Sequence, residues 1–102
     1  EKLEVKDFFC EFNVVDNYPN PFNPKTKINI RIENDAFITL DIFTTHGQKV
    51  RTLFNGTVLS GTRQFVWDGK NSYGQKASSG IYIAVLIENG FPIGSKRMLM
   101  LK

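Results

Sequence analysis

The chain has 102 residues, 41% of them hydrophobic, which suffices for one domain with its own core, and no run reaches the roughly 18 apolar residues of a membrane span. A single cysteine excludes an internal disulfide and a cysteine-based zinc site. The net charge is +3, with eleven bases and five acids in residues 17–102, but the bases are spread singly and form no stripe interleaved with aromatic residues, so we expect no nucleic-acid partner.

Residues 1–16 are acidic and are interpreted as a linker or as the end of a preceding domain. The chain starts at Glu1 rather than at a methionine, so we expect it to be a piece of a longer protein. Cys10 has no neighbouring base that would make it a reactive thiolate. We therefore interpret Cys10 as a small buried hydrophobe without a chemical role, and place the domain at residues 17–102.

Residues 17–24, here called the strap, read Asn-Tyr-Pro-Asn-Pro-Phe-Asn-Pro and hold three prolines in six residues. Proline fixes φ and lacks a backbone donor, and it pushes the preceding residue to extended geometry. We therefore expect a stiff, non-helical segment that enters the domain. Tyr18 and Phe22 are the expected anchors, because two rings allow an extended strap to lie across the end of a sheet and plug it.

The next segments alternate between apolar and polar residues, as strands with one wet face do. This pattern predicts strands over residues 27–32 and 38–42, and a return strand over 48–54 after the turn Thr45-His46-Gly47. The last two strands are expected to form a hairpin. Asn55-Gly56 is interpreted as a turn after that hairpin.

Residues 63–67 predict a short strand in which Phe65 and Trp67 share one face, with Trp67 as the central core ring. A thirteen-residue loop, 68–80, follows and is rich in Gly, Ser, Asn and Lys. Within it, only Tyr73 and Ala77 are expected to pack. Its oxygen-bearing side chains do not follow the alternation of a calcium loop, so a hydrogen-bonded turn is the favoured interpretation over a calcium site.

Residues 81–87 are apolar on both alternating faces and predict a central strand. Glu88-Asn89-Gly90 is a turn that permits positive φ, and residues 95–102 form a final strand. Alternation fails in that strand at Met98-Leu99-Met100-Leu101. It is therefore either central in the sheet, or an edge with one apolar face that another molecule recognises. An ordinary core strand that ends in a protective lysine is the favoured interpretation. We expect a monomer, or a weak dimer through this strand if its edge is exposed.

About seven short strands separated by glycine-containing turns predict an all-β fold, an antiparallel immunoglobulin-like β-sandwich without a disulfide. Few residues of the chain could support catalysis. The single histidine, His46, lies in a turn with no nucleophile beside it in sequence. We predict that the domain is not an enzyme. We also expect no metal, no cofactor and no small-molecule substrate.

Several motifs together resemble the type IX secretion system type A sorting domain, and the related immunoglobulin-like domain of flagellar hook-capping proteins. The motifs are Phe12-x-Val14, the proline strap, Trp67-Asp68-Gly69, Gly80-Ile81-Tyr82 and the closing residues 96–102. The order and spacing match over residues 12–102.

The resemblance implies a non-catalytic carboxyl-terminal signal of a Gram-negative bacterium that folds in the periplasm and docks on the outer-membrane secretion translocon. It directs its cargo to the cell surface or outside, and in several members a sortase-like protease then removes it. The positions that match the family's motifs, and that would serve translocon recognition, are Pro19, Pro21, Gly80, Tyr82, Lys96, Arg97, Met98 and Lys102.

Two other functions remain open from the residues. A structural or assembly module would depend on a subunit-contact face and would tolerate residues added after Lys102. An accessory carbohydrate-binding sandwich would need exposed rings on one face, for which Tyr73 and Phe91 are the candidates.

Overall fold

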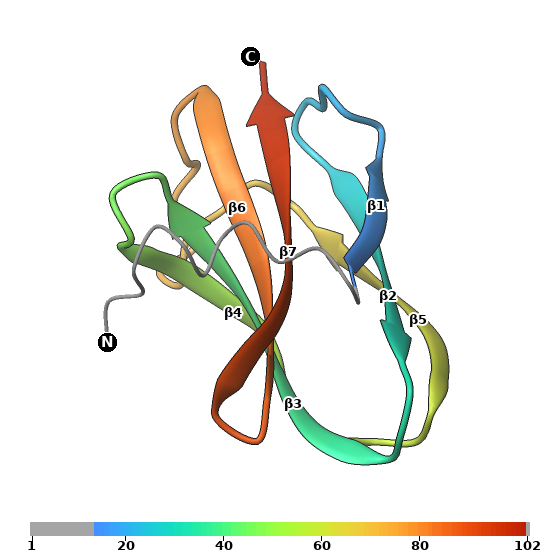
Figure 1. The fold of residues 1–102 in the computed structure, drawn as a ribbon. Coiled ribbons are helices and arrows are strands. Elements are labelled where there is room, and N and C mark those ends of the chain that lie inside the picture. The colour runs from blue at the N-terminus through green and yellow to red at the C-terminus, as the bar shows by residue number, and fades with distance from the viewer. Residues whose placement is uncertain (1–13, 102) are drawn as a thin grey trace.

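The computed structural model describes residues 14–101 and contains two antiparallel sheets packed face to face (Figure 1). The smaller sheet has the order β1-β2-β5, and the larger one has the order β4-β3-β6-β7. The strands are β1 Val14–Tyr18, β2 Thr26–Ile32, β3 Ala36–Thr44, β4 Lys49–Val58, β5 Gly61–Trp67, β6 Gly80–Glu88 and β7 Phe91–Met100. The predicted all-β sandwich of about seven strands is thus confirmed.

The core lies between the sheets, where alternate residues of each strand point inward. In β2 every second residue from Thr26 to Ile32 is buried, and the inward residues of β3 and β6 face them from the other sheet. Trp67, at the end of β5, is fully buried, as predicted for the central ring. Among the described residues, no helix is long and apolar enough to cross a membrane.

The predicted hairpin is present as β3 and β4, but it is longer than expected. Asn55 and Gly56, predicted as a turn, continue β4 as far as Val58. That prediction was wrong because both residues are paired: Asn55 Oδ1 accepts a hydrogen bond from Thr39 Oγ1 at 2.9 Å. Gly56 lies beneath the Phe54 ring, which an added Cβ would approach to 3.2 Å. Glycine here accommodates a ring instead of reversing the chain.

The strand predicted to be central is β6, which pairs with β3 on one side and β7 on the other. Its inward side chains join the main core, while Ile83 and Val85 are buried on the opposite face beside Phe43. The predicted turn after β6 is also confirmed, with positive φ at Asn89 (51°) and Gly90 (89°).

The terminal strand β7 is an edge strand of the larger sheet and begins at Phe91, four residues before the predicted start. The apparent failure of alternation is resolved by its packing. Met98 and Met100 are each 1% exposed and point into the core, whereas Leu99 is half-buried and Leu101 is exposed. The interpretation as ordinary core is therefore confirmed for the two methionines, although β7 lies at an edge of the sheet and not at its centre.

The loop between β5 and β6 is held by a dense set of hydrogen bonds. Asn71 Oδ1 accepts from the backbone N–H groups of Tyr73 (2.9 Å) and Gln75 (3.0 Å), and Ala77 N donates to Gly69 O at 2.8 Å. The favoured interpretation of a hydrogen-bonded turn is confirmed. Ala77 packs against the core as predicted, but Tyr73 is 88% exposed because the turn centred on Asn71 directs it outward.

Candidate functional site

The strap and the end of β7, far apart in sequence, meet at one end of the sandwich. Phe22 N donates to Leu99 O, and Leu101 N donates to Phe22 O, each at 2.9 Å. These two bonds form a parallel bridge in which Phe22 lies opposite Met100. Asn20 adds a third bond, since its Oδ1 accepts from Leu99 N at 3.0 Å. We call this contact, formed by residues 20–22 and 99–101, the strap–tail seam.

Beneath the seam lies a cluster of three aromatic rings. Phe22 is 2% exposed and lies 5.6 Å from Trp67 between ring centroids, with the planes tilted by 58°. Tyr82 meets Trp67 edge-on at 5.1 Å. Trp67 Nε1 donates to Lys70 O at 2.9 Å, so the buried indole has its partner. Phe22 is therefore an anchor of the strap, as predicted.

Tyr18, the second predicted anchor, is 73% exposed. It lies at the end of β1, where alternation turns the neighbouring Asn17 inward instead. Asn17 Nδ2 donates to Thr26 Oγ1 at 3.1 Å, and Thr26 Oγ1 donates to Pro19 O at 2.9 Å. A buried polar relay thus fixes the start of the strap where an aromatic ring was expected.

The Trp67-Asp68-Gly69 turn packs directly against both the strap and the tail. Gly69 has φ +79°, and a Cβ placed there would approach Pro24 O to 2.8 Å and Met100 Sδ to 3.2 Å. The position therefore requires glycine for its backbone conformation and for its lack of a side chain. Asp68 Oδ1 accepts from Lys70 N at 3.0 Å and from Arg51 at 2.8 Å, which ties the turn to β4.

The Gly80-Ile81-Tyr82 motif begins β6 and supports the tail from the adjacent strand. Tyr82 lies opposite Met98 in the sheet, and its hydroxyl donates to Ser78 O at 2.6 Å. Burial raises the pKa of Tyr82 above its ordinary 10.0. Tyr82 thus acts as a neutral structural ring that supports β7.

The eight residues expected to serve recognition divide by exposure. Tyr82 and Met98 are 8% and 1% exposed, so both act mainly through packing in the folded domain. The strap residues Pro19 and Pro21 are exposed, as is Arg97 on β7. Gly80 and Lys96 are half-buried, and Lys102 lies outside the described residues, as does Cys10.

Sequence reasoning missed Asn20 as a residue of this site. Its side chain supplies the acceptor for Leu99 N, an edge group that would otherwise face solvent. The available signal was its position between two prolines. An asparagine held there carries an amide oxygen that can accept a hydrogen bond from an unpaired N–H group at a strand edge.

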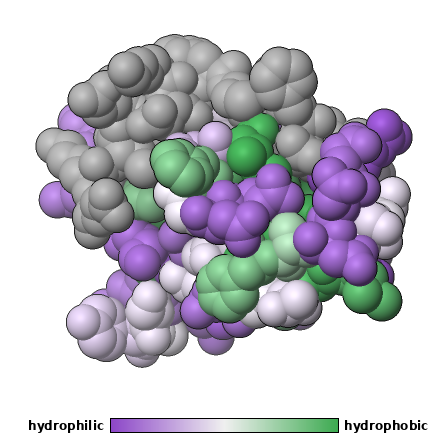
Figure 2. All heavy atoms as spheres, turned by 60° about the horizontal axis from the view of Figure 1, so that its bottom comes forward, coloured by the Kyte–Doolittle hydropathy of each residue, from purple (hydrophilic) through white to green (hydrophobic). Residues whose placement is uncertain are grey.

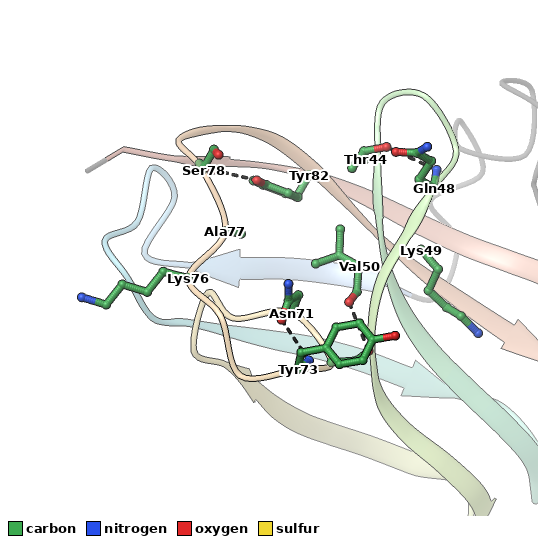
Figure 3. A pocket seen from close by; sticks show the side chains of 11 residues that line it. Thr44, Gln48, Lys49, Val50, Asn71, Tyr73, Lys76, Ala77, Ser78 and Tyr82 are labelled. Carbon is green, nitrogen blue, oxygen red and sulfur yellow. Dashed lines mark hydrogen bonds between the residues drawn. The ribbon is translucent and has the colours of Figure 1, made fainter.

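A hollow of about 470 Å³ lies between the β3–β4 turn and the loop before β6 (Figure 3). Its lining includes Val50 and Ala77 at the base and the outward-turned Tyr73. Several polar groups there are already engaged: Ser72 Oγ donates to Val50 O at 3.2 Å, and Ser78 O accepts from Tyr82. The hollow is thus braced by its own hydrogen bonds.

The two rings considered for carbohydrate binding lie at opposite ends of the sandwich. Tyr73 borders the hollow near the strap end, whereas Phe91 follows the β6–β7 turn. Figure 2 brings that far end forward and shows hydrophobic residues scattered among hydrophilic ones. Phe91 is 73% exposed and Leu59, in the β4–β5 turn, is 64% exposed. Tyr73 and Phe91 therefore cannot form one binding face.

Among residues 14–101, no three His, Cys, Asp or Glu side chains gather where they could hold a metal ion.

Known structures share this fold. PorU from Porphyromonas gingivalis, solved as a dimeric latent form, aligns with 87% of this chain at 20% identity and a TM-score of 0.71. PorZ, an essential surface component of the type-IX secretion system of the same bacterium, aligns with 85% at 19% identity and 0.54. The chain spans only 9% of the PorU chain and 11% of the PorZ chain.

FlgD from P. aeruginosa aligns with 85% of this chain and 70% of its own, at 21% identity and a TM-score of 0.57. No curated protein matches the sequence. Residues 17–87, from the strap into the central strand β6, match the FlgD Ig-like domain. The relationship to the immunoglobulin-like domain of hook-capping proteins is thus confirmed, and the chain belongs to the FlgD Ig-like domain family.

Proposed function

We propose that this domain is a non-catalytic carboxyl-terminal sorting domain, which directs its cargo across the outer membrane through the type IX secretion system and docks by its last strand. The observation that carries the proposal is the strap–tail seam, where the motifs of the strap, the Trp67 turn, β6 and β7 converge. The shared fold of PorZ supports the same interpretation. The partner is the outer-membrane translocon, with a sortase-like protease as a further partner. The route is through the periplasm to the cell surface or the medium.

Exposure divides the roles at the seam. Arg97 and Leu101 face outward on the tail and form the docking contact, and Pro19 and Pro21 lie exposed beside it on the strap. The buried residues, Tyr82 and Met98, hold β7 in place. A partner can contact surface residues that carry charge or exposed apolar area, whereas buried residues act through packing.

The experiment fuses the chain to a periplasmic reporter in a type IX-competent bacterium and measures surface display by protease accessibility. Removing residues 96–102 would take two buried methionines from the core, so outward substitutions are the sharper test. Arg97→Glu and Leu101→Asp should retain the reporter in the periplasm. Leu59→Asp, an exposed apolar residue at the opposite end, is the matched control and should be displayed.

The outcome is decisive if thermal unfolding shows all three variants folded. Display that depends on Arg97 and Leu101 supports a signal read at the tail. Periplasmic retention of the unsubstituted fusion would contradict the sorting function.

A structural or assembly module is the second candidate, and the family match over residues 17–87 favours it. That match ends before β7, so an assembly role would place its contact face elsewhere on the sandwich. Such a module should tolerate Leu101→Asp and residues appended after the tail.

A further inference from the structure

The outer edge of β7 is already occupied at its carboxyl end. Leu99 uses its C=O for Phe22 and its N–H for Asn20, and Leu101 uses its N–H for Phe22. Ser95 and Arg97, further back on the same strand, also have interaction partners. A docking protein that adds a strand to the tail therefore meets an edge whose bonds at residues 99–101 are closed by the domain itself.

The occupant is short and holds the edge by few groups. One residue, Phe22, makes both backbone bonds, and the prolines at positions 21 and 24 have no N–H to extend the pairing. The rest of the attachment is one exposed side-chain bond from Asn20 and the burial of the Phe22 ring over Trp67. Such a segment resembles a bound extended peptide, with a main-chain bridge for affinity and one pocket for a side chain.

We propose that the outer edge of β7 is a strand-acceptor site and that the strap occupies it reversibly. The secretion partner displaces the strap with an extended segment of its own. That segment inserts a large apolar side chain into the position that Phe22 occupies. The regulatory part rests on the proposed sorting function; the acceptor site does not. In the free domain the tail edge is closed. The strap is released in only a small fraction of molecules. The apparent affinity for a partner is therefore the intrinsic affinity multiplied by that fraction.

The test uses the chain of 102 residues, its Phe22→Ala variant and its Tyr18→Ala variant. Tyr18 is the matched control, since it is an aromatic residue next to the strap prolines but 73% exposed. Amide hydrogen exchange of Leu99 and Leu101 is measured relative to Leu86 in the central strand, which separates release of the strap from global destabilisation. Phe22→Ala should accelerate the two tail amides at least about 100-fold relative to Leu86, and Tyr18→Ala should leave them unchanged.

A synthetic peptide of residues 17–25 is then the probe for the acceptor site. It should bind the Phe22→Ala chain and restore protection of Leu99 and Leu101, while a peptide carrying alanine in place of Phe22 should not. The native chain should bind the same peptide at least about 100-fold more weakly, because its own strap competes. Equal binding to both chains, no binding to the variant, or unchanged exchange at the tail would overturn the proposal.

Two gentler variants keep the test open if Phe22→Ala does not fold. Asn20→Ala removes only an exposed acceptor and should accelerate exchange of Leu99, whereas Asn20→Asp keeps an oxygen at the same position and should not. Equal exchange in the two variants would show that Asn20 does not close the edge. None of these measurements needs a secretion apparatus, so their failure is distinguishable from failure of the display experiment.

Discussion

Gly69→Ala tests whether the turn after Trp67 truly packs against the strap and the tail. At φ +79° an alanine Cβ costs roughly 1–2 kcal/mol from backbone sterics alone. That Cβ would also lie 2.8 Å from Pro24 O, a backbone atom with little freedom to move, and 3.2 Å from Met100 Sδ. Overpacking of this kind adds roughly 1–3 kcal/mol. The expected loss is therefore about 2–5 kcal/mol, a large part of the stability of a domain this size.

The control is Gly74→Ala, because Gly74 has the same φ of +79° but nothing within 4 Å of an added Cβ. It should lose only the backbone part, roughly 1–2 kcal/mol. Urea unfolding of the native chain and both variants gives the free energies, and their melting temperatures should differ by about 4 °C or more for each kcal/mol of difference. Equal losses in the two variants would refute the tight contact among turn, strap and tail.

Three further predictions concern polar groups near the seam. The free energy of unfolding should fall as the pH rises above 10, because folding raises the pKa of Tyr82, so its hydroxyl stays neutral in the folded state while it ionises in the unfolded chain. In the Tyr82→Phe variant, the urea midpoint should depend less steeply on pH over this range. Thr26→Val should cost roughly 1–3 kcal/mol in urea unfolding, since the buried Asn17 amide loses its closer acceptor and keeps only Pro19 O at 3.4 Å. A loss near zero would show that the Asn17–Thr26 hydrogen bond is dispensable. Arg51→Met keeps the aliphatic stem and should lower the free energy of unfolding by less than about 1 kcal/mol. The loss is small because both partners of the 2.8 Å ion pair between Arg51 and Asp68 are about a third exposed. It should shrink further in concentrated salt, which screens the charges.

Local patterns determined most of the fold from sequence. Period-two alternation identified β2 and the β3–β4 hairpin, and an apolar run on both faces identified β6 as central. These predictions hold because each strand's burial depends on its own pattern and on which faces are covered. The position of Trp67 at the end of a short alternating strand likewise indicated a buried ring, and it is fully buried.

The errors arose where a distant segment decides the local structure. Gly56 was interpreted as part of a turn, but its pairing opposite Ile38 of β3 continues the strand. Tyr18 was taken for an anchor because nothing in the local sequence shows that alternation in β1 would turn Asn17 inward. The closed edge at Leu99 depends on Asn20, 79 residues earlier, and no local pattern reports a contact at that separation.

The tail has two roles that deletion cannot separate. On its inner face, Met98 and Met100 complete the core beside Trp67 and Tyr82, so loss of these residues weakens the whole sandwich. On its outer side, the edge at Leu99 is closed by the strap. A truncated tail would therefore fail in any assay that requires a folded domain, whatever the tail's role in docking. Only substitutions that face outward, or that release the strap while leaving the methionines in place, can distinguish recognition of the tail from its contribution to stability.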